Sequence, residues 1–316
     1  MTILQQACQD VPGFDALYKR ILRKMKIEDK APSTCVNYCR CLAQLALYFK
    51  ITPSELDTEQ VEEYLFGLIN NGVEGINNRF KFTVYGLRYA YRVEGKKQIN
   101  VALPSIRNYR RLPTVLSKDE VRLMLNKPHK LKHRVLIALL YGCGLRLNEV
   151  RNLKVEDIDL ERSTLIVRKS KNRRDRCMPM GSTLTAILRH YLKIQRPTNF
   201  LVPGFRWNTA TGNRFYLVLD KMYGSRTVQW AIKHAAKLAG IKKPVNVHSL
   251  RHTFATHLLE DGVNILTIKE LLGHASIRTT MIYLHVAQVD NRQRRSPLDS
   301  LNGVEVIRKT QGEFPF

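Results

Sequence analysis

Helical periodicity runs through most of this chain of 316 residues. Apolar residues in the stretch 14–26 alternate with basic ones at the spacing of a helix with one buried face: Phe14, Leu17, Ile21, Leu22 and Met25. A strand pattern occurs where segments 164–168 and 176–180 flank a polar stretch, which predicts a β-hairpin with a basic tip. We therefore expect a mainly α-helical protein with one small β-sheet.

The first hundred residues read as successive helices. We expect them over 14–26, over 36–49 with Ser33 or Thr34 as the cap, from Pro53 and Ser54 to about residue 70, and over about 75–93. Residues 95–114 then lose the periodicity, hold two prolines and concentrate arginine, as a basic linker would.

The rest of the chain opens on Ser117 and Glu120, which have the spacing of a capping box. An apolar helix over 134–141 stops at Gly142 and Gly144, and further helices are expected at about 182–194, 225–239, 249–261 and 264–272. At roughly 100–200 residues per domain the length predicts two domains. We place them at 1–100 and 117–290, with a linker over 101–116 and a tail over 291–316.

Positive charge indicates the class of partner. The chain has 52 Lys and Arg against 27 Asp and Glu, a net charge of +25. Such an excess repels itself and is best explained if a polyanion neutralises it, so nucleic acid is the favoured partner. The candidate phosphate-binding residues are cations on the fourth helix, in the linker and in the hairpin tip: Arg79, Lys81, Arg88, Arg107, Arg110, Arg111, Lys169, Arg173 and Arg174.

Other classes are excluded by composition. No apolar run has the roughly 18 residues of a membrane span, and the first residues lack the cation and apolar core of a signal peptide, so we expect a cytoplasmic protein with no membrane partner. Cys35, Cys39 and Cys41 lack a nearby histidine or second cysteine pair, which favours helix packing over a zinc site. Neither a metal nor a cofactor is expected.

Three separated stretches carry chemistry. In the first, Arg146 follows a glycine turn at the start of a helix, where an anion is favoured. In the second, His248 and Arg251 stand three residues apart at a helix start and can project to one side. In the third, His274 follows a glycine and precedes Tyr283 by nine residues.

Together the stretches describe a site for phosphoryl transfer without a metal. Two arginines can clamp the oxygens of one phosphate, and histidines can hydrogen-bond the charge that develops in the transition state. The nucleophile must then be a side chain, for which Tyr283 has suitable chemistry. Its phenol, with an ordinary pKa of about 10, needs a base or a strongly cationic pocket.

With these residues the chain resembles the tyrosine recombinases, the phage integrase family that includes the Xer recombinases and integron integrases. The resemblance covers nearly the whole chain and implies a two-domain clamp on DNA, with a helical core-binding domain and an α+β catalytic domain. Residue by residue, it implies that Arg146, His248, Arg251, His274 and Tyr283 are catalytic. It also implies a supporting role for Glu149, and a catalytic lysine on the hairpin turn at Lys171, with Lys169 as the alternative.

The family mechanism follows from the resemblance. Tyr283 would attack the scissile phosphate to give a 3′-phosphotyrosine and a free 5′-hydroxyl, with Lys171 as the general acid. The 5′-hydroxyl of the partner strand would reverse the step and give a Holliday junction. The implied partners are double-stranded DNA with a specific recombination site and further copies of the chain, as a tetramer on synapsed DNA in the nucleoid. The tail would pack on a neighbouring protomer or be disordered.

Two alternatives stay open at this point. One is a DNA-binding protein without strand-transfer activity, against which the complete set of site residues argues. The other is a type IB topoisomerase, which would use a similar pocket to relax DNA as a monomer; the helical first domain and the stretch from Gly273 to Tyr283 favour recombination.

Overall fold

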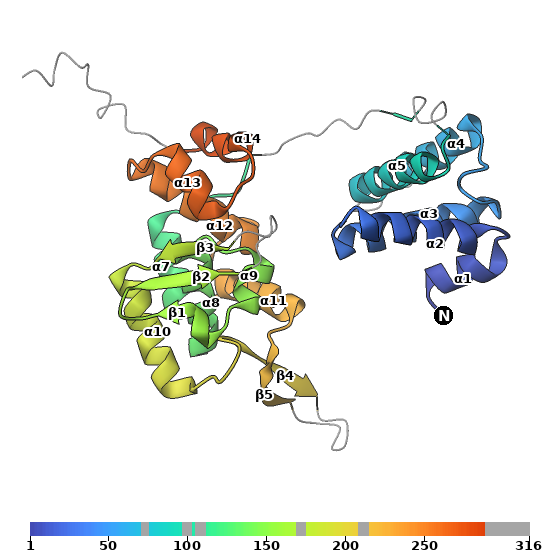
Figure 1. Cartoon of the computed structure of the whole chain (residues 1–316). Coiled ribbons are helices and arrows are strands. Elements are labelled where there is room, and N and C mark those ends of the chain that lie inside the picture. Colours follow the sequence, from blue (N-terminus) through green and yellow to red (C-terminus); the bar gives the residue numbers. More distant parts are fainter. Residues whose placement is uncertain (71–75, 97–102, 105–111, 169–174, 208–214, 288–316) are drawn as a thin grey trace, which may run out of the picture. The chain divides into compact units, whose positions relative to one another are not determined.

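The chain forms two compact units, Met1–Arg110 and Arg111–Phe316, in the computed structural model (Figure 1). The structure describes residues 1–70, 76–96, 103–104, 112–168, 175–207 and 215–287. The predicted tail at 291–316, the hairpin tip and most of the predicted linker lie outside these residues. Each unit has its own hydrophobic core.

The first unit is helical in the part that the structure describes. Its helices are α1 (Ile3–Asp10), α2 (Phe14–Ile27), α3 (Pro32–Phe49), α4 (Thr58–Asn70) and α5 (Ile76–Val93). The predicted α2 and α5 are confirmed, whereas α1 had not been predicted. On α3, Cys39 and Cys41 are buried in the helix packing, as expected for small core residues.

Two predicted helix starts are wrong. Helix α3 begins at Pro32 with Ala31 as its N-cap, because a proline without an N–H fits the first helical turn, so Ser33 and Thr34 lie inside the helix. Helix α4 begins after Asp57, whose carboxylate Oδ1 accepts a hydrogen bond of 2.8 Å from the backbone N–H of Gln60.

The second unit is built around α8 (Leu131–Gly142), which contacts α7 (Lys118–Asn126), α9 (Leu147–Asn152) and three later helices. Those helices are α10 (Ser182–Gln195), α11 (Ser225–Leu238) and α12 (Val247–Glu260). The middle residues of α8, among them Leu136, Ile137 and Leu140, are completely buried, which explains why the sequence is uninterruptedly apolar over 135–140. The capping box of Ser117 and Glu120 is present at the start of α7, as predicted.

A three-stranded antiparallel sheet contains the predicted hairpin. Its strands are β1 (Ile158–Asp159), β2 (Thr164–Val167) and β3 (Arg176–Pro179), in the order β1-β2-β3. Leu165 pairs with Met178, and both are buried on the face toward the core. Since side chains alternate along a strand, Arg176 lies on the same face as Met178 and points inward.

The prediction of a single sheet is wrong. A second sheet pairs β4 (Pro203–Trp207) with β5 (Phe215–Met222), and β1 extends the first sheet beyond the predicted hairpin. A two-residue strand such as β1 is too short to show a period of two in the sequence.

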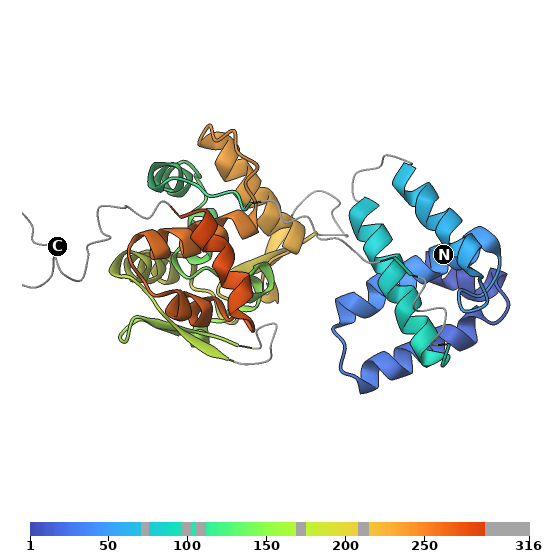
Figure 2. The same cartoon turned by 90° about the horizontal axis from the view of Figure 1, so that it is seen from above.

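The chain after α12 closes one end of this unit. Helix α13 (Ile265–Leu272) contacts α12 and β3, and it is followed by α14 (Ile277–Thr280) and the 3-10 helix η2 (Met281–His285). Figures 1 and 2 show α13 and α14, in red, next to α12 and the sheet. The three sequence motifs therefore reach one region of the second unit from α9, α12 and the α13–η2 segment.

Candidate active site

Arg146 is fixed at the start of α9 by the turn before it. Gly144 has a left-handed φ of 56°, which a side chain would disfavour, and it directs the chain into the helix. The Arg146 guanidinium donates to Glu149 Oε1 at 2.7 Å, and the Arg146 backbone N–H donates to Glu149 Oε2 at 2.9 Å. Arg146 is the donor in both hydrogen bonds, so the Glu149 carboxylate holds the guanidinium and the backbone of Arg146 together.

Arg251 is buried in the first turns of α12, with 3% of its surface exposed. Its guanidinium donates to the carbonyl of Gly144 at 2.6 Å and lies 4.0 Å from Glu149 Oε2. Burial, and next the charge of Arg146, lower the pKa of Arg251 to about 9. An anion bound nearby would therefore stabilise the charged form of this buried guanidinium.

Sequence reasoning missed Arg176, which completes the cluster. The Arg176 guanidinium donates to both oxygens of Glu149, at 3.0 and 2.8 Å. The sequence contained one sign of it: Arg176 is two residues from the apolar Met178 and so shares the inward face of β3. A cation on that face needs a buried partner of opposite charge. Burial alone would raise the pKa of the Glu149 carboxylate. The hydrogen bonds and charge of Arg176, and next the hydrogen bonds of Arg146, outweigh burial and lower this pKa to about 2.

The end of α13 holds all three guanidinium groups. The last carbonyls of a helix lack partners within the helix and stand at the negative end of its dipole. Here the carbonyls of residues 271–273 each accept a hydrogen bond from a different arginine. In that order the donors are Arg176, Arg251 and Arg146, at N–O distances of 2.8, 2.5 and 3.1 Å. Three guanidinium groups around one carboxylate leave an excess of positive charge for a phosphate.

His274 is the residue directly after Gly273, whose carbonyl accepts the hydrogen bond of Arg146. Gly273 ends α13 with a left-handed φ of 61°, and the Nδ1 atom of His274 lies 2.9 Å from the hydroxyl of Thr280. Burial, followed by the charges of Arg251 and Arg146, lowers the pKa of His274 to about 3. The imidazole is therefore neutral near pH 7. If the Thr280 hydroxyl donates to Nδ1, the Nε2–H is left to donate to a ligand.

His248 and Tyr283 are the remaining predicted catalytic residues that the structure describes. His248 has an exposed side chain at the start of α12, yet partial desolvation and the charges of Arg251 and Arg146 lower its pKa. Tyr283, on η2, is 1% exposed. Burial raises the pKa of its phenol, while Arg251 and then Arg146 act in the opposite direction. The predicted Arg146, Arg251 and Tyr283 thus lie close enough to interact electrostatically.

Tyr283 has a partner that sequence reasoning did not include. Its Oη lies 3.0 Å from Nδ1 of His252, the residue after Arg251. The motif was visible in the sequence, but which of its histidines contacts the tyrosine depends on how η2 packs against α12.

The remaining predicted cations divide into two groups. On α5, Arg79 is exposed, Lys81 is half-buried, and Arg88 donates to the carbonyls of Leu103 and Pro104 at 3.3 and 3.1 Å. The others lie outside the described residues: Lys171, Lys169, Arg173, Arg174, Arg107, Arg110 and Arg111.

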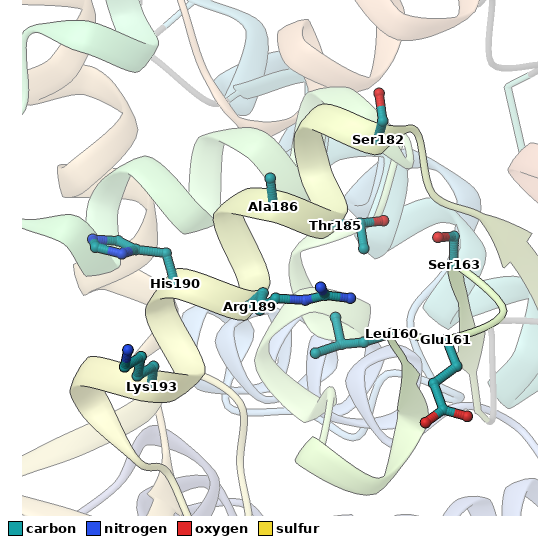
Figure 3. Close-up of a pocket in the computed structure, with 9 residues that line it drawn as sticks. All are labelled: Leu160, Glu161, Ser163, Ser182, Thr185, Ala186, Arg189, His190 and Lys193. Atoms are coloured by element: carbon teal, nitrogen blue, oxygen red, sulfur yellow. The ribbon is translucent and has the colours of Figure 1, made fainter.

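A shallow pocket elsewhere on the second unit contains none of the predicted catalytic residues. It lies between α10 and the β1–β2 turn, and Arg189, His190 and Glu161 are among its lining residues (Figure 3). Within the described ranges, no cluster of His, Cys, Asp and Glu could hold a metal ion. In the same ranges no helix is both long and apolar enough to cross a membrane.

Comparison with known proteins identifies the family. Residues 114–289 match the phage integrase family, and residues 17–80 match the N-terminal SAM-like domain of phage integrases. The chain is 31% identical over 296 residues to the tyrosine recombinase XerA of Thermococcus kodakarensis, covering 92% of this chain and 95% of that protein. It is 35% identical over 245 residues to XerA of Pyrococcus horikoshii, covering 77% of each.

A solved structure supports the fold. A lambda integrase dimer bound to a COC′ core site superposes with a TM-score of 0.64 at 20% identity, over 88% of this chain and 78% of that one. The family that this chain matches consists of enzymes that cleave and rejoin DNA. The chain belongs to the phage integrase family and is a site-specific tyrosine recombinase.

Proposed function

We propose that Tyr283 is the nucleophile of this recombinase and that Arg146 and Arg251 bind the scissile phosphate. The proposal rests on the proximity of residues from α9, α12 and η2. The guanidinium groups of Arg146 and Arg251 both donate to carbonyls at the end of α13, and the charges of both lower the pKa of the buried Tyr283 phenol against the effect of burial. A phosphodiester bound there receives charged hydrogen bonds that strengthen as its negative charge grows in the transition state.

The other residues supply hydrogen bonds and protons. His248 and His274 hydrogen-bond the non-bridging oxygens, and Glu149 holds Arg146 in place. Attack by the Tyr283 Oη forms a 3′-phosphotyrosine and breaks the bond to the 5′-oxygen, which takes a proton from Lys171. Attack by the 5′-hydroxyl of a partner strand then releases the tyrosine and leads to a Holliday junction. One phosphoester replaces another, so the exchange consumes no nucleotide.

The biological assembly belongs to the same proposal. Two pairs of protomers bring two recombination sites together as a tetramer, and the protein acts on chromosomal DNA in the cytoplasm. Support comes from family membership and from the charge of +25, which suits a DNA partner. Light scattering of the chain mixed with its site duplex tests the stoichiometry.

Covalent capture tests the nucleophile. The probe is a duplex that the full chain selects from a random-sequence pool, nicked beside the cleavage point so that the released fragment cannot rejoin. The wild-type chain should form an adduct that resists denaturation. Tyr283→Phe should bind the duplex equally and form none, because the variant has lost only a hydroxyl.

Tyr141→Phe is the matched control. The Tyr141 hydroxyl lies 2.9 Å from Nδ1 of His257, so this variant removes a similar hydroxyl from a similar pair outside the site. It should form the adduct at the wild-type rate. An undiminished adduct with Tyr283→Phe would reject the assignment. Transfer of the covalent strand to a second duplex separates recombination from simple relaxation.

A further inference from the structure

His252 is the partner that the structure gives to the Tyr283 hydroxyl. The two polar atoms, Nδ1 and Oη, are 3.0 Å apart, and the ring centroids are 5.6 Å apart with planes tilted by 54°. The helix α12 fixes His252 next to the buried Arg251, and η2 fixes Tyr283 against α12. The distance is within reach of a direct proton transfer.

Both members of the pair are neutral in the free protein. Burial, and next His248 and Arg251, lower the pKa of His252 to about 4, so one ring nitrogen is unprotonated at pH 7. Burial raises the pKa of the Tyr283 phenol, so the hydroxyl keeps its proton. With the imidazole hydrogen on Nε2, the phenol donates its hydrogen bond to Nδ1.

The other two histidines of the site are placed for different work. Nδ1 of His274 is occupied by the Thr280 hydroxyl. His248 has an exposed side chain, at the open side of the site, whereas Tyr283 is buried. A proton leaving the phenol therefore has its direct acceptor in His252.

We propose that His252 is a catalytic residue: it is the general base that takes the proton from Tyr283 as the tyrosine attacks the phosphate. The inference rests on the proposed role of Tyr283. As the Oη–P bond forms, the Oη–H bond breaks and its proton moves to Nδ1, giving an imidazolium, while the leaving 5′-oxygen takes its proton from the general acid. On rejoining, the imidazolium returns the proton to the departing phenolate oxygen.

Charge around the pair links this step to DNA binding. His252 faces His248 and Arg251 on its own helix, Tyr283 on η2, and His274 beyond α13, and the nearby arginine disfavours an imidazolium in the free protein. A phosphodiester held by Arg146 and Arg251 brings a negative charge that offsets theirs. His252 therefore becomes a competent base when the phosphate is in place, which protects the tyrosine from earlier ionisation.

Two substitutions separate proton transfer from positioning. His252→Asn keeps a polar atom near the position of Nδ1 but cannot take a proton, and His252→Ala removes both functions. With the nicked duplex defined above, we expect both variants to lower the rate of adduct formation by roughly 100-fold or more, with unchanged duplex affinity. Wild-type rates in His252→Asn would reduce His252 to a positioning residue and overturn the proposal.

His257→Asn is the matched control for the cost of losing a buried histidine. His257 lies on the same helix, is buried, and has its Nδ1 2.9 Å from the Tyr141 hydroxyl. Because the pair lies outside the site, the rate of adduct formation should stay at the wild-type value. An equal loss in both asparagine variants would mean that helix packing is responsible, and the proposal would fail.

A more acidic phenol gives an independent test. Difluorotyrosine at position 283 ionises more readily and needs less help from a base. It should recover at least about 10-fold of the rate lost in His252→Ala. Absence of recovery would contradict the proposal.

A measurement on the unsubstituted chain covers the case in which His252→Ala does not fold. With a 5′-phosphorothiolate the sulfur leaves without a proton, so a solvent deuterium isotope effect on cleavage reports the phenol proton alone. We expect an isotope effect, and its absence would reject general-base catalysis. An adduct formed by Tyr283→Phe rejects the proposed function itself, whereas an inactive Tyr283→Phe beside a fully active His252→Ala rejects His252 alone.

Discussion

Arg176 and Glu149 form a bidentate ion pair that joins β3 to α9, with N–O distances of 3.0 and 2.8 Å. Their side chains are only 10% and 6% exposed. The same guanidinium reaches the carbonyl of Leu271, so one side chain connects the sheet, α9 and the end of α13. Removal of Arg176 would leave the buried Glu149 carboxylate with Arg146 and, at 4.0 Å, Arg251 as cationic neighbours, and would release one of the three anchors on α13.

Arg176→Gln should therefore destabilise the protein by roughly 3–5 kcal/mol, the cost of breaking a buried pair from one side. It should also slow cleavage, because Glu149 and the α13 end position the arginines of the site. Denaturant unfolding and adduct formation measure the two effects. Arg162→Gln is the control: Arg162 is 86% exposed, 3.9 Å from Asp159, and its loss should cost no more than about 1 kcal/mol. Equal costs for the two variants would contradict a buried network.

Gly144→Ala should lower both stability and activity. An added Cβ would overlap the ring of Phe254 and lie 3.1 Å from a side-chain carbon of Leu272, and Gly144 has a left-handed φ of 56°. Its carbonyl also accepts the hydrogen bond of Arg251, so a shift of the turn moves that guanidinium. The expected loss is roughly 1–3 kcal/mol from overpacking in addition to the backbone strain.

Gly240→Ala isolates the strain. Gly240 has a left-handed φ of 69°, and an added methyl group would meet no described atom within 4 Å beyond its chain neighbours. The variant should lose about 1–2 kcal/mol and keep its cleavage rate. If Gly144→Ala were no worse than Gly240→Ala, contact with Phe254 would have no part in shaping the site.

Most of the longer helices could be predicted from periodicity, but α1 and some helix starts could not. Pro53 and Ser54 have the residue types of a helix start, yet Ser54 is buried and its carbonyl accepts a hydrogen bond of 2.5 Å from Lys96, 42 residues later. The helix begins after Asp57 instead, and the Asp57 carboxylate accepts a hydrogen bond from the backbone N–H of Gln60. Local propensity is compatible with a helix start at Ser54 or at Asp57, and the contact of Lys96 with the Ser54 carbonyl favours the later start.

The same distinction holds at the site. Arg146, Arg251 and Tyr283 belong to short motifs that could be grouped by chemistry, and the structure brings them together around the end of α13. Arg176 and His252 contact partners on other elements, Glu149 and Tyr283, and these contacts form only when β3 packs near α9 and η2 packs against α12. A sequence pattern indicates residue types, whereas packing decides the pairs.

Mild acid should destabilise the free protein before its carboxylates titrate. Burial is the main cause that lowers the pKa of His133 and His252 to about 4 and of His274 to about 3. The unfolded chain has ordinary histidines near 6.5, so it binds more protons, and stability falls as pH drops from about 6.5 to about 4. The Glu149 carboxylate, with its pKa of about 2, adds a further loss from about 4.5 downward.

Denaturant unfolding between pH 7.5 and 4 measures this slope. His133→Gln should flatten it, because His133 is buried beside the hydroxyl of Tyr223, 3.3 Å away, and lies outside the predicted catalytic set. A slope that begins only near pH 4.5 in the wild-type chain would contradict neutral buried histidines.

Binding to the selected duplex should weaken steeply with salt. Each phosphate contact releases counterions, and a protein with 6–10 such contacts loses on the order of 10³–10⁵ in affinity between 50 and 200 mM salt. Arg79, exposed on α5, is a predicted contact, so Arg79→Ala should reduce the log–log slope by about one. Fluorescence anisotropy over a salt series measures both slopes. A flat response would exclude a binding mode based on phosphate contacts.

Lys171→Ala should slow cleavage of the ordinary duplex, and a 5′-phosphorothiolate should restore it. The reason is that a general acid protonates the leaving 5′-oxygen, whereas a thiolate leaves readily without a proton. Lys169→Ala is the decisive comparison, since it removes the same charge two residues away in the hairpin segment. Lys169→Ala should at most weaken duplex binding, and the 5′-phosphorothiolate should not raise its cleavage rate relative to the wild-type chain. Rescue confined to Lys169→Ala would transfer the general-acid role to Lys169, and rescue of neither variant would mean that the proton comes from another group.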